Sequence, residues 1–525
     1  MIRLNITKTG INGEGIGFYK RKPVFVDGCF KDEVVSCELI DEGRHYRGRL
    51  IKVLKFSKER VRTLCPLQKL CGACNLMAVN YKEQLRIKKE LLEGALDKYY
   101  RHIDVPDVVA SDKIICYRNK CNLPFFESQG KLVNALYHQG SNHPIFFDEC
   151  VIHEEKVEQI RKKVLQILND HQLKVYDHKI RKGLRQLVIR GFADQYQLVL
   201  ISGNDRFDKK LIEDLLNIQD VVSVYQGINT VKNPLHLMNE KIRCIGGKKK
   251  ITFSLGTYKL SLSPDAFFQL NENQADRIYT DVSRMIDSKV DTIVEAYSGI
   301  GAISLYLHGK AKEVIGIELI ESAVKDAKEN VLLNGIENIS FVCDDASKAL
   351  RKIAKHKPID VLVVDPPRSG LDDEILTTIL KTGIRKIIYI SCNPATLAKN
   401  LEVLSEKYEV RSIQPYDMFP QTAHVETVVL LSKVEKSTKK IHVDFSLEGM
   451  DLSGLKEGAT YEEKSSQHQR NRNKGEQVHT GGRILWRAQA EYGLYQIPQK
   501  RNEKGQYRDY VDVSGNQYQK NVFCL

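Results

Sequence analysis

The sequence predicts an α/β multidomain protein, and three observations support this prediction. Hydrophobic strands and amphipathic helices alternate from about residue 290 to residue 433, which is typical of a sheet with parallel strands. Residues 1–55 contain short strand-like runs separated by glycine turns, and residues 113–260 are mainly strand-like. A length of 525 residues is sufficient for about three or four such domains.

Composition and charge restrict the classes of function. Hydrophobic residues make up 42% and charged residues 28%, which excludes a collagen-like, wholly disordered or small disulfide-rich protein. A net charge of +13 suits a polyanionic partner such as RNA, although a basic soluble protein without such a partner has the same charge. No run of about 18 apolar residues and no apolar secretion signal is present, so we expect a cytoplasmic protein with reduced thiols and no membrane association.

The first segment, residues 1–56, has the pattern of a small OB-like β-barrel. Lys20, Arg21 and Lys22 follow Phe18 and Tyr19 between two strand-like runs. Basic and aromatic side chains on such a barrel suit single-stranded nucleic acid, but a purely structural barrel has the same features.

The central segment, residues 57–260, is expected to be a mixed α+β domain. Apolar residues recur at helical spacing from Tyr81 to Tyr99, which predicts a helix over 76–100 with a solvated basic face. Two further helices are expected near 154–169 and 205–217, within a region that otherwise reads as strands.

A first ligand-binding motif begins at residue 290. VDTIVEAYSGIGAISLYL predicts a strand, a glycine turn and a helix, but Gly299 and Gly301 are only two of the three glycines of a dinucleotide fingerprint. Glu318 ends the next strand, where a carboxylate can accept both hydroxyl groups of an adenosine ribose. These residues alone leave S-adenosylmethionine as one of several candidate ligands.

Three further motifs place reactive side chains at strand ends. Asp365 ends one hydrophobic strand and Cys392 follows another, so both are expected beyond the carboxyl edge of the sheet, where ligands bind. An inert buried thiol is the alternative for Cys392, but a strand end followed by Asn-Pro is a turn and not a core position. Glu426 begins an apolar strand, which is a costly place for a carboxylate without a function.

A cysteine motif, CPLQKLCGAC, indicates a metal centre. Cys65, Cys71 and Cys74 have the spacing C-x5-C-x2-C, and three soft ligands require a fourth from elsewhere. The spacing alone allows either zinc or an iron–sulfur cluster. Three later cysteines compete for the fourth position: Cys116, Cys121 and Cys150.

Taken together, the motifs resemble the RNA 5-methyluridine (uracil-5-) methyltransferase family. The motifs are PDAFFQLN (264–271), EAYSGIG, GIEL, DPPR, SCNP and HVETV, and the resemblance covers nearly everything from residue 1 to about 435. It implies a TRAM-like OB barrel at 1–56, the central α+β domain, and a Rossmann-like methyltransferase domain at 261–435. The family expectation for that domain is a seven-stranded sheet with an antiparallel edge strand.

The resemblance also implies roles for individual residues. S-adenosylmethionine would be bound by Gln269, Tyr297, Glu318 and Asp365. Carbon 5 of uracil is a poor nucleophile, so a thiolate must first add at carbon 6. Cys392 would be that nucleophile, and Glu426 would be the base that removes the carbon-5 proton after methylation.

Two related families are separated from this interpretation by the DPPR motif. RNA cytosine-5 methyltransferases have a second cysteine at that motif, and adenine-N6 methyltransferases have an aromatic residue where Arg368 stands here. The sequence therefore favours a uridine substrate.

Ribosomal-RNA members of the family carry a [4Fe–4S] cluster, and by this resemblance the ligands would be Cys65, Cys71, Cys74 and Cys150. The remaining cysteines are read as ordinary thiols. Transfer-RNA members generally lack both the barrel and the cluster, so 23S ribosomal RNA, in some cases as an assembly intermediate, is the expected partner of a monomeric enzyme. The same chemistry on tRNA and a catalytically silent RNA-binding protein are the alternatives.

The C-terminal extension, residues 436–525, is the part that the resemblance explains least. Residues 440–463 are like an extension found on some family members, whereas the remainder is rich in Gln, Asn, Arg and Gly without a sustained period. Disorder, a shifted reading frame and an RNA-binding arm are the three interpretations of that remainder.

Overall fold

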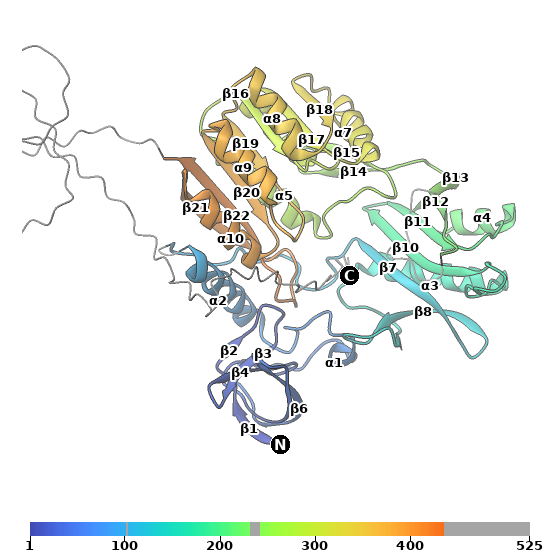
Figure 1. Cartoon of the computed structure of the whole chain (residues 1–525). Coiled ribbons are helices and arrows are strands. Elements are labelled where there is room, and N and C mark those ends of the chain that lie inside the picture. The colour runs from blue at the N-terminus through green and yellow to red at the C-terminus, as the bar shows by residue number, and fades with distance from the viewer. Residues whose placement is uncertain (101–102, 232–241, 435–525) are drawn as a thin grey trace, which may run out of the picture. The chain divides into compact units, whose positions relative to one another are not determined.

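The computed structural model describes residues 1–100, 103–231 and 242–434 (Figure 1). The predictions for the C-terminal extension lie outside these residues. Within the described ranges no helix is both long enough and apolar enough to cross a bilayer.

The N-terminal residues form a six-stranded sheet with the order β1-β5-β6-β4-β3-β2. Alternating residues of these strands, such as Val24, Val26, Val35 and Cys37, are buried in a common core. The expected strand-rich segment is therefore present, and its identity as a TRAM barrel stays a prediction. The strands are β1 (Ile2–Asn5), β2 (Lys8–Thr9), β3 (Gly15–Tyr19), β4 (Lys22–Val26), β5 (Val34–Asp41) and β6 (Tyr46–Lys55).

Two helices follow, the short α1 (Gln68–Cys71) and the long α2 (Tyr81–Tyr99). The side chain of Asn80 caps α2 by accepting a hydrogen bond from the backbone N–H of Glu83. The predicted helix over 76–100 is thus present but begins later. Its buried face differs from the expected apolar stripe, because Lys88 is buried on it together with the apolar residues Leu92 and Leu96.

The central region is built on a second sheet with the order β13-β12-β11-β10-β7-β8-β9. The expected helices near 154–169 and 205–217 are present as α3 (Glu155–Asp170) and α4 (Lys209–Leu216). The strands are β7 (Lys120–Ser128), β8 (Lys131–Tyr137), β9 (Pro144–Phe146), β10 (Leu184–Phe192), β11 (Gln195–Ser202), β12 (Val221–Ile228) and β13 (Ile242–Gly247).

The C-terminal described region contains the expected βαβ units. Its sheet has the order β18-β17-β16-β19-β20-β22-β21, and the first five strands are mutually parallel. A hairpin, β14 (Ile251–Leu255) and β15 (Tyr258–Leu262), precedes it. The strands are β16 (Val290–Ala296), β17 (Ala311–Glu318), β18 (Ile339–Cys343), β19 (Val361–Val364), β20 (Lys386–Ser391), β21 (Tyr408–Tyr416) and β22 (Glu426–Lys433).

Helices cover both faces of this sheet. Successive residues of a strand point to opposite faces, so they are buried in two different cores. Ile293 lies in one core and Val294 in the other, and the second core also takes up Leu92 and Leu96 of α2. The helices are α5 (Glu272–Arg284), α6 (Ala302–Leu307), α7 (Glu321–Leu333), α8 (Ala346–His356), α9 (Asp373–Thr382) and α10 (Pro394–Leu404), with a short 3₁₀ turn at His308–Lys310.

The position of the antiparallel strand differs from the expectation. Strand β22 is antiparallel to both neighbours, but it lies between β20 and β21 and is not the edge strand (Figure 1). In chain order β21 comes first and forms the edge of the sheet. Residues 417–425 then reverse the direction of the chain, so that β22 lies between β21 and β20. This insertion brings the beginning of β22 to the carboxyl end of β20.

Candidate active site

Three reactive side chains meet at the carboxyl edge of the third sheet. Asp365 follows β19, Cys392 follows β20, and Glu426 is the first residue of β22. The antiparallel register pairs Ser391 with Thr427, so Cys392 and Glu426 lie on the same side of that pair, at the end of the sheet. The predicted nucleophile and base are therefore brought together by strand pairing between residues distant in sequence.

The three groups influence one another electrostatically. Burial raises the pKa of Cys392 to about 12, the charges of Glu426 and Asp365 add to the rise, and the Arg368 guanidinium opposes it. Burial likewise raises the pKa of Asp365 to about 7 and, together with Asp365, raises the pKa of Glu426 well above its usual range. The resting thiol is consequently protonated at neutral pH, and carboxyl groups that can exchange protons lie beside it.

Arg368 is held in place by the neighbouring turn and by a histidine. Its backbone carbonyl accepts hydrogen bonds from the Asn393 amide at 3.0 Å and from the Thr396 hydroxyl at 3.2 Å. Its Nη2 donates to Nε2 of His424 at 3.0 Å. Burial and the positive charge of Arg368 lower the pKa of His424 to about 4, so the imidazole is neutral and can accept this bond.

Arg368 and His424 were not identified as site residues from the sequence. Both lie within three positions of a predicted site residue, Arg368 after Asp365 and His424 before Glu426. That adjacency was the available signal, but the pairing of the two side chains depends on the tertiary structure.

Glu318 is fixed beside the glycine turn that follows β16. Its two carboxylate oxygens accept hydrogen bonds from the backbone N–H of Gly299 and of Ile320, both at 2.9 Å. Tyr297, Gly299 and Gly301 have positive φ angles of 66°, 53° and 76°, which bend the chain sharply at this point.

The same turn fits an adenosine-bearing ligand. A β-carbon built on Gly299 would meet nothing within 4 Å, so the turn borders open space. Each oxygen of Glu318 has a second lone pair that remains for a ribose hydroxyl. The hydroxyl oxygen of Ser298 is buried without a hydrogen-bond partner among the described residues.

Two further predicted cofactor residues, Asp365 and Gln269, lie outside this turn. Tyr389 lies close enough to Tyr297, Cys392 and Asp365 for all three to raise its pKa, in addition to burial, so these groups surround one region. Gln269 is held through its backbone carbonyl, which accepts a hydrogen bond from the Asn119 side chain at 3.1 Å. The cofactor roles of Gln269, Tyr297, Glu318 and Asp365 stay predictions.

The four predicted metal-binding cysteines approach one another. Burial raises the pKa values of Cys65, Cys71 and Cys74, and in each case the nearby Cys150 adds to the rise. Burial also acts to raise the pKa of Cys150, but the adjacent His153 outweighs burial and lowers it. Nevertheless, no three His, Cys, Asp or Glu residues in the described part of the chain are arranged to hold a metal ion.

Comparison with known proteins identifies the family. A family model described as tRNA (uracil-5-)-methyltransferase matches residues 80–434. A Listeria monocytogenes protein named as an RNA methyltransferase is 34% identical over 448 residues, spanning 82% of this chain and 97% of the relative. The chain belongs to the tRNA (uracil-5-)-methyltransferase family. A relative in Enterococcus faecalis, also named as an RNA methyltransferase, is 36% identical over 446 residues, with 82% and 97% of the two chains covered.

A solved structure of similar fold supports the same assignment. The tRNA (uracil-54, C5)-methyltransferase of Pyrococcus abyssi, in complex with S-adenosyl-L-homocysteine, aligns with a TM-score of 0.68 and 25% identity. The alignment covers 82% of this chain and 100% of the other. The mixed α/β methyltransferase fold is thereby confirmed, and family membership supports RNA as substrate and S-adenosylmethionine as methyl donor.

Proposed function

We propose that this protein methylates carbon 5 of a uridine in 23S ribosomal RNA through a covalent adduct between Cys392 and carbon 6. The observation that carries the proposal is the meeting of Cys392 and Glu426 at the end of strands β20 and β22. A nucleophile and a base at one site are what the two halves of this reaction require.

The chemistry follows from the reactivity of uracil. The Cys392 thiol loses its proton, and its sulfur forms a bond to carbon 6, which turns the base into an enolate with a nucleophilic carbon 5. S-adenosylmethionine, when bound, would supply an electrophilic methyl group to that carbon and leave as S-adenosylhomocysteine. Glu426 then removes the remaining proton from carbon 5, and the electron pair expels the thiolate and restores the ring double bond.

The surroundings of Cys392 suit the first step. Because burial keeps the thiol protonated, the proton must pass to a neighbouring group when the base arrives, and Asp365, whose pKa of about 7 leaves part of it ionised at neutral pH, can accept it. The positive charge of Arg368 favours the thiolate and can also stabilise the enolate. A uridine in stacked RNA must first be flipped into this site, which costs a few kcal/mol.

Two features support a ribosomal substrate. The N-terminal sheet, which we propose to be a TRAM-like RNA-binding domain over residues 1–56, places Lys22 5.3 Å from the ring centre of Tyr46. The four associated cysteines are the second feature. Transfer RNA is the competing substrate, because the matching family model and the Pyrococcus enzyme are both named for it.

The test is to incubate the purified protein and S-adenosylmethionine with unmethylated 23S ribosomal RNA and, separately, with unmethylated tRNA. The amount of 5-methyluridine in each RNA is then measured, and the modified position is mapped. We expect 5-methyluridine in the ribosomal RNA. Methylation of tRNA alone would replace the substrate, and RNA binding without any methylation would favour the silent RNA-binding alternative.

We further propose that Cys65, Cys71, Cys74 and Cys150 bind a [4Fe–4S] cluster. Support comes from the proximity of the four thiols, which affect one another's pKa values. The positive charge of Arg118 also acts to lower the pKa values of Cys71, Cys74 and Cys150. The ligands of one metal ion must converge on a single point, whereas cluster thiolates bind separate irons and stand farther apart. The cluster would be structural, since methyl transfer requires no electron.

Replacement of Cys150 by serine should remove the cluster. We expect about four irons per chain and a brown colour in the anaerobically purified wild type, and loss of both iron and thermal stability in Cys150→Ser. Iron content, absorption spectrum and melting temperature measure this. Cys116→Ser is the matched control, because Cys116 lies near Cys150 but is not a proposed ligand, and it should retain iron. A colourless wild type with one zinc per chain would contradict the cluster.

A further inference from the structure

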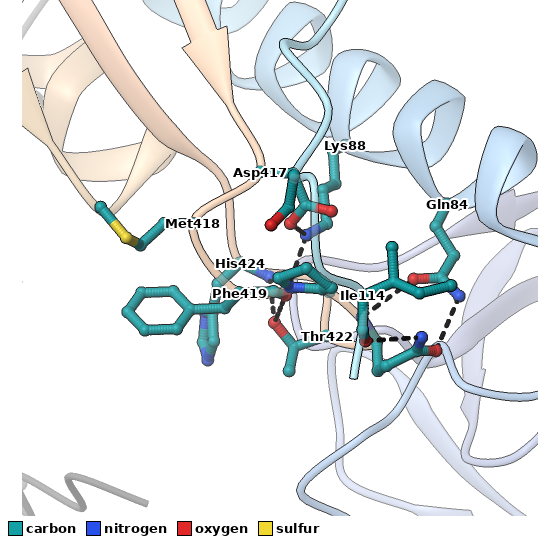
Figure 2. A network of polar contacts seen from close by, with 12 residues as sticks. Gln84, Lys88, Ile114, Asp417, Met418, Phe419, Thr422 and His424 are labelled. Atoms are coloured by element: carbon teal, nitrogen blue, oxygen red, sulfur yellow. Dashed lines mark hydrogen bonds and ion pairs between the residues drawn. The ribbon is translucent and has the colours of Figure 1, made fainter. Parts of the chain in front are cut away.

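The side chain of Lys88 is fully buried on helix α2, although Lys82 and Lys98 of the same helix are exposed. Burying an ammonium group is unfavourable unless an opposite charge and hydrogen bonds compensate. The Lys88 ammonium forms an ion pair with the equally buried Asp417 and donates a hydrogen bond to the Phe419 carbonyl at 3.0 Å (Figure 2). These contacts join α2 to the loop 417–425, which leads directly to Glu426.

A series of hydrogen bonds continues from Phe419 toward the reacting thiol. The Thr422 hydroxyl donates to the same Phe419 carbonyl at 2.8 Å and accepts from the His424 backbone N–H at 3.3 Å (Figure 2). The His424 ring accepts the hydrogen bond from Arg368 at 3.0 Å. Arg368 is the positive charge that opposes the rise in the pKa of Cys392.

Helix α2 also fixes the middle of the loop. Gln421 has a positive φ of 71°, a conformation that a non-glycine residue keeps only when its surroundings impose it. The side chain of Gln84 supplies this restraint twice, by accepting from the Gln421 backbone N–H and by donating to its side-chain oxygen, both at 3.0 Å. The Gln421 amide in turn donates to the Ile114 carbonyl at 3.0 Å.

We propose that Lys88 is a positioning residue for methyl transfer, which holds the 417–425 loop so that His424 keeps Arg368 beside the reacting thiol. The inference rests on the proposed function and adds to it a residue from outside the strands that carry the reacting groups. Stability alone does not account for Lys88, because a buried ion pair can often be replaced by uncharged residues without loss of stability. The bond to the Phe419 carbonyl, in contrast, can be made only by a donor at this point.

The first test removes both buried charges together. Lys88→Met combined with Asp417→Asn leaves no uncompensated charge, so the double variant should fold. We expect its kcat to fall about tenfold, with an unchanged KM for S-adenosylmethionine, because the methyl donor is bound elsewhere. The pH–rate profile of Cys392 alkylation should also move up by about one unit, which makes the rate about tenfold lower at a fixed pH.

The alkylation is measured on the Cys392 peptide by mass spectrometry, in the full chain and without RNA. The charged groups that act on the pKa of this thiol are Glu426, Asp365 and Arg368. Lys88 faces Asp417, with which the Tyr81 hydroxyl also interacts, and it acts on the pKa of His424. Lys89→Met is the matched control, because Lys89 is the next residue of α2 and its ion pair with Asp107 lies at the surface. It should leave both the profile and kcat unchanged.

A second variant interrupts the same series of contacts without altering any charge. Thr422→Val keeps the shape of the side chain but removes the hydroxyl that links Phe419 to His424. It should shift the alkylation profile in the same direction as the double variant. If the double variant does not fold, Thr422→Val alone tests whether these contacts position the site.

The outcomes separate the inference from the proposed function. A wild type that forms no 5-methyluridine in any RNA would overturn the proposed function, whereas the alkylation profile needs no RNA. A folded double variant, or Thr422→Val, with a wild-type profile and wild-type kcat would overturn the positioning role of Lys88. An equal shift in Lys89→Met would overturn it as well.

Discussion

Replacement of Cys392 by alanine should abolish methyl transfer while the protein still binds S-adenosylmethionine. Without the sulfur, carbon 5 of the uracil is not activated, so we expect 5-methyluridine formation to fall by about three orders of magnitude or more. We expect retained cofactor binding, because the proposed cofactor residue Glu318 ends β17 and its glycine turn follows β16, whereas Cys392 follows β20. Incorporation of a labelled methyl group and calorimetric titration with S-adenosylhomocysteine measure the two effects separately.

The control for this variant is Cys343→Ala. Cys343 is an exposed thiol at the end of β18, in the same sheet, so its removal tests whether the loss is specific to Cys392. We expect methylation by this control to stay at the wild-type rate. Appreciable turnover by Cys392→Ala would refute the nucleophile, and loss of cofactor binding in that variant would refute the separation of the two roles.

The fold was predictable where sequence patterns are local. The alternation of strands and helices after residue 290 indicated the parallel sheet. The strands that end just before Asp365 and at Ser391 are visible in the sequence as apolar runs followed by a proline turn. The insertion of β22 between β20 and β21 was not predictable, because the order of strands in a sheet depends on which strands pair with one another and not on a local sequence pattern. That insertion is what places Glu426 beside Cys392.

The residues that the sequence did not reveal depend on contacts between distant segments. Nothing in the sequence indicated that Lys88 is buried, because helical spacing cannot show that Asp417 lies opposite it. The pairing of Arg368 with His424 is hidden for the same reason. The spacing of the cysteines also left three candidates for the fourth metal ligand. In the structure, Cys150 lies near enough to all three cysteines of the motif to raise their pKa values.

Replacement of Glu426 by glutamine should stop the reaction after methyl transfer and leave the protein covalently attached to RNA. Addition of the thiolate and attack on the methyl group do not require the base, but glutamine cannot take the proton from carbon 5. The thiolate then cannot leave, so turnover should fall by about two to four orders of magnitude. A slowly migrating protein–RNA band should accumulate on a denaturing gel.

The identity of that band can be tested with a second substitution. Cys392→Ala combined with Glu426→Gln should form no band, because the adduct requires the sulfur. The retained methyl group also distinguishes a late block from an early one, since RNA labelled from S-adenosylmethionine should comigrate with the protein.

A band without label would mean that Glu426 acts before methyl transfer, as a proton acceptor for the thiol, which its position beside Cys392 also allows. Normal turnover without any band would assign the base to another group, and Asp365, with a pKa raised to about 7 by burial, is the nearest alternative that the structure offers.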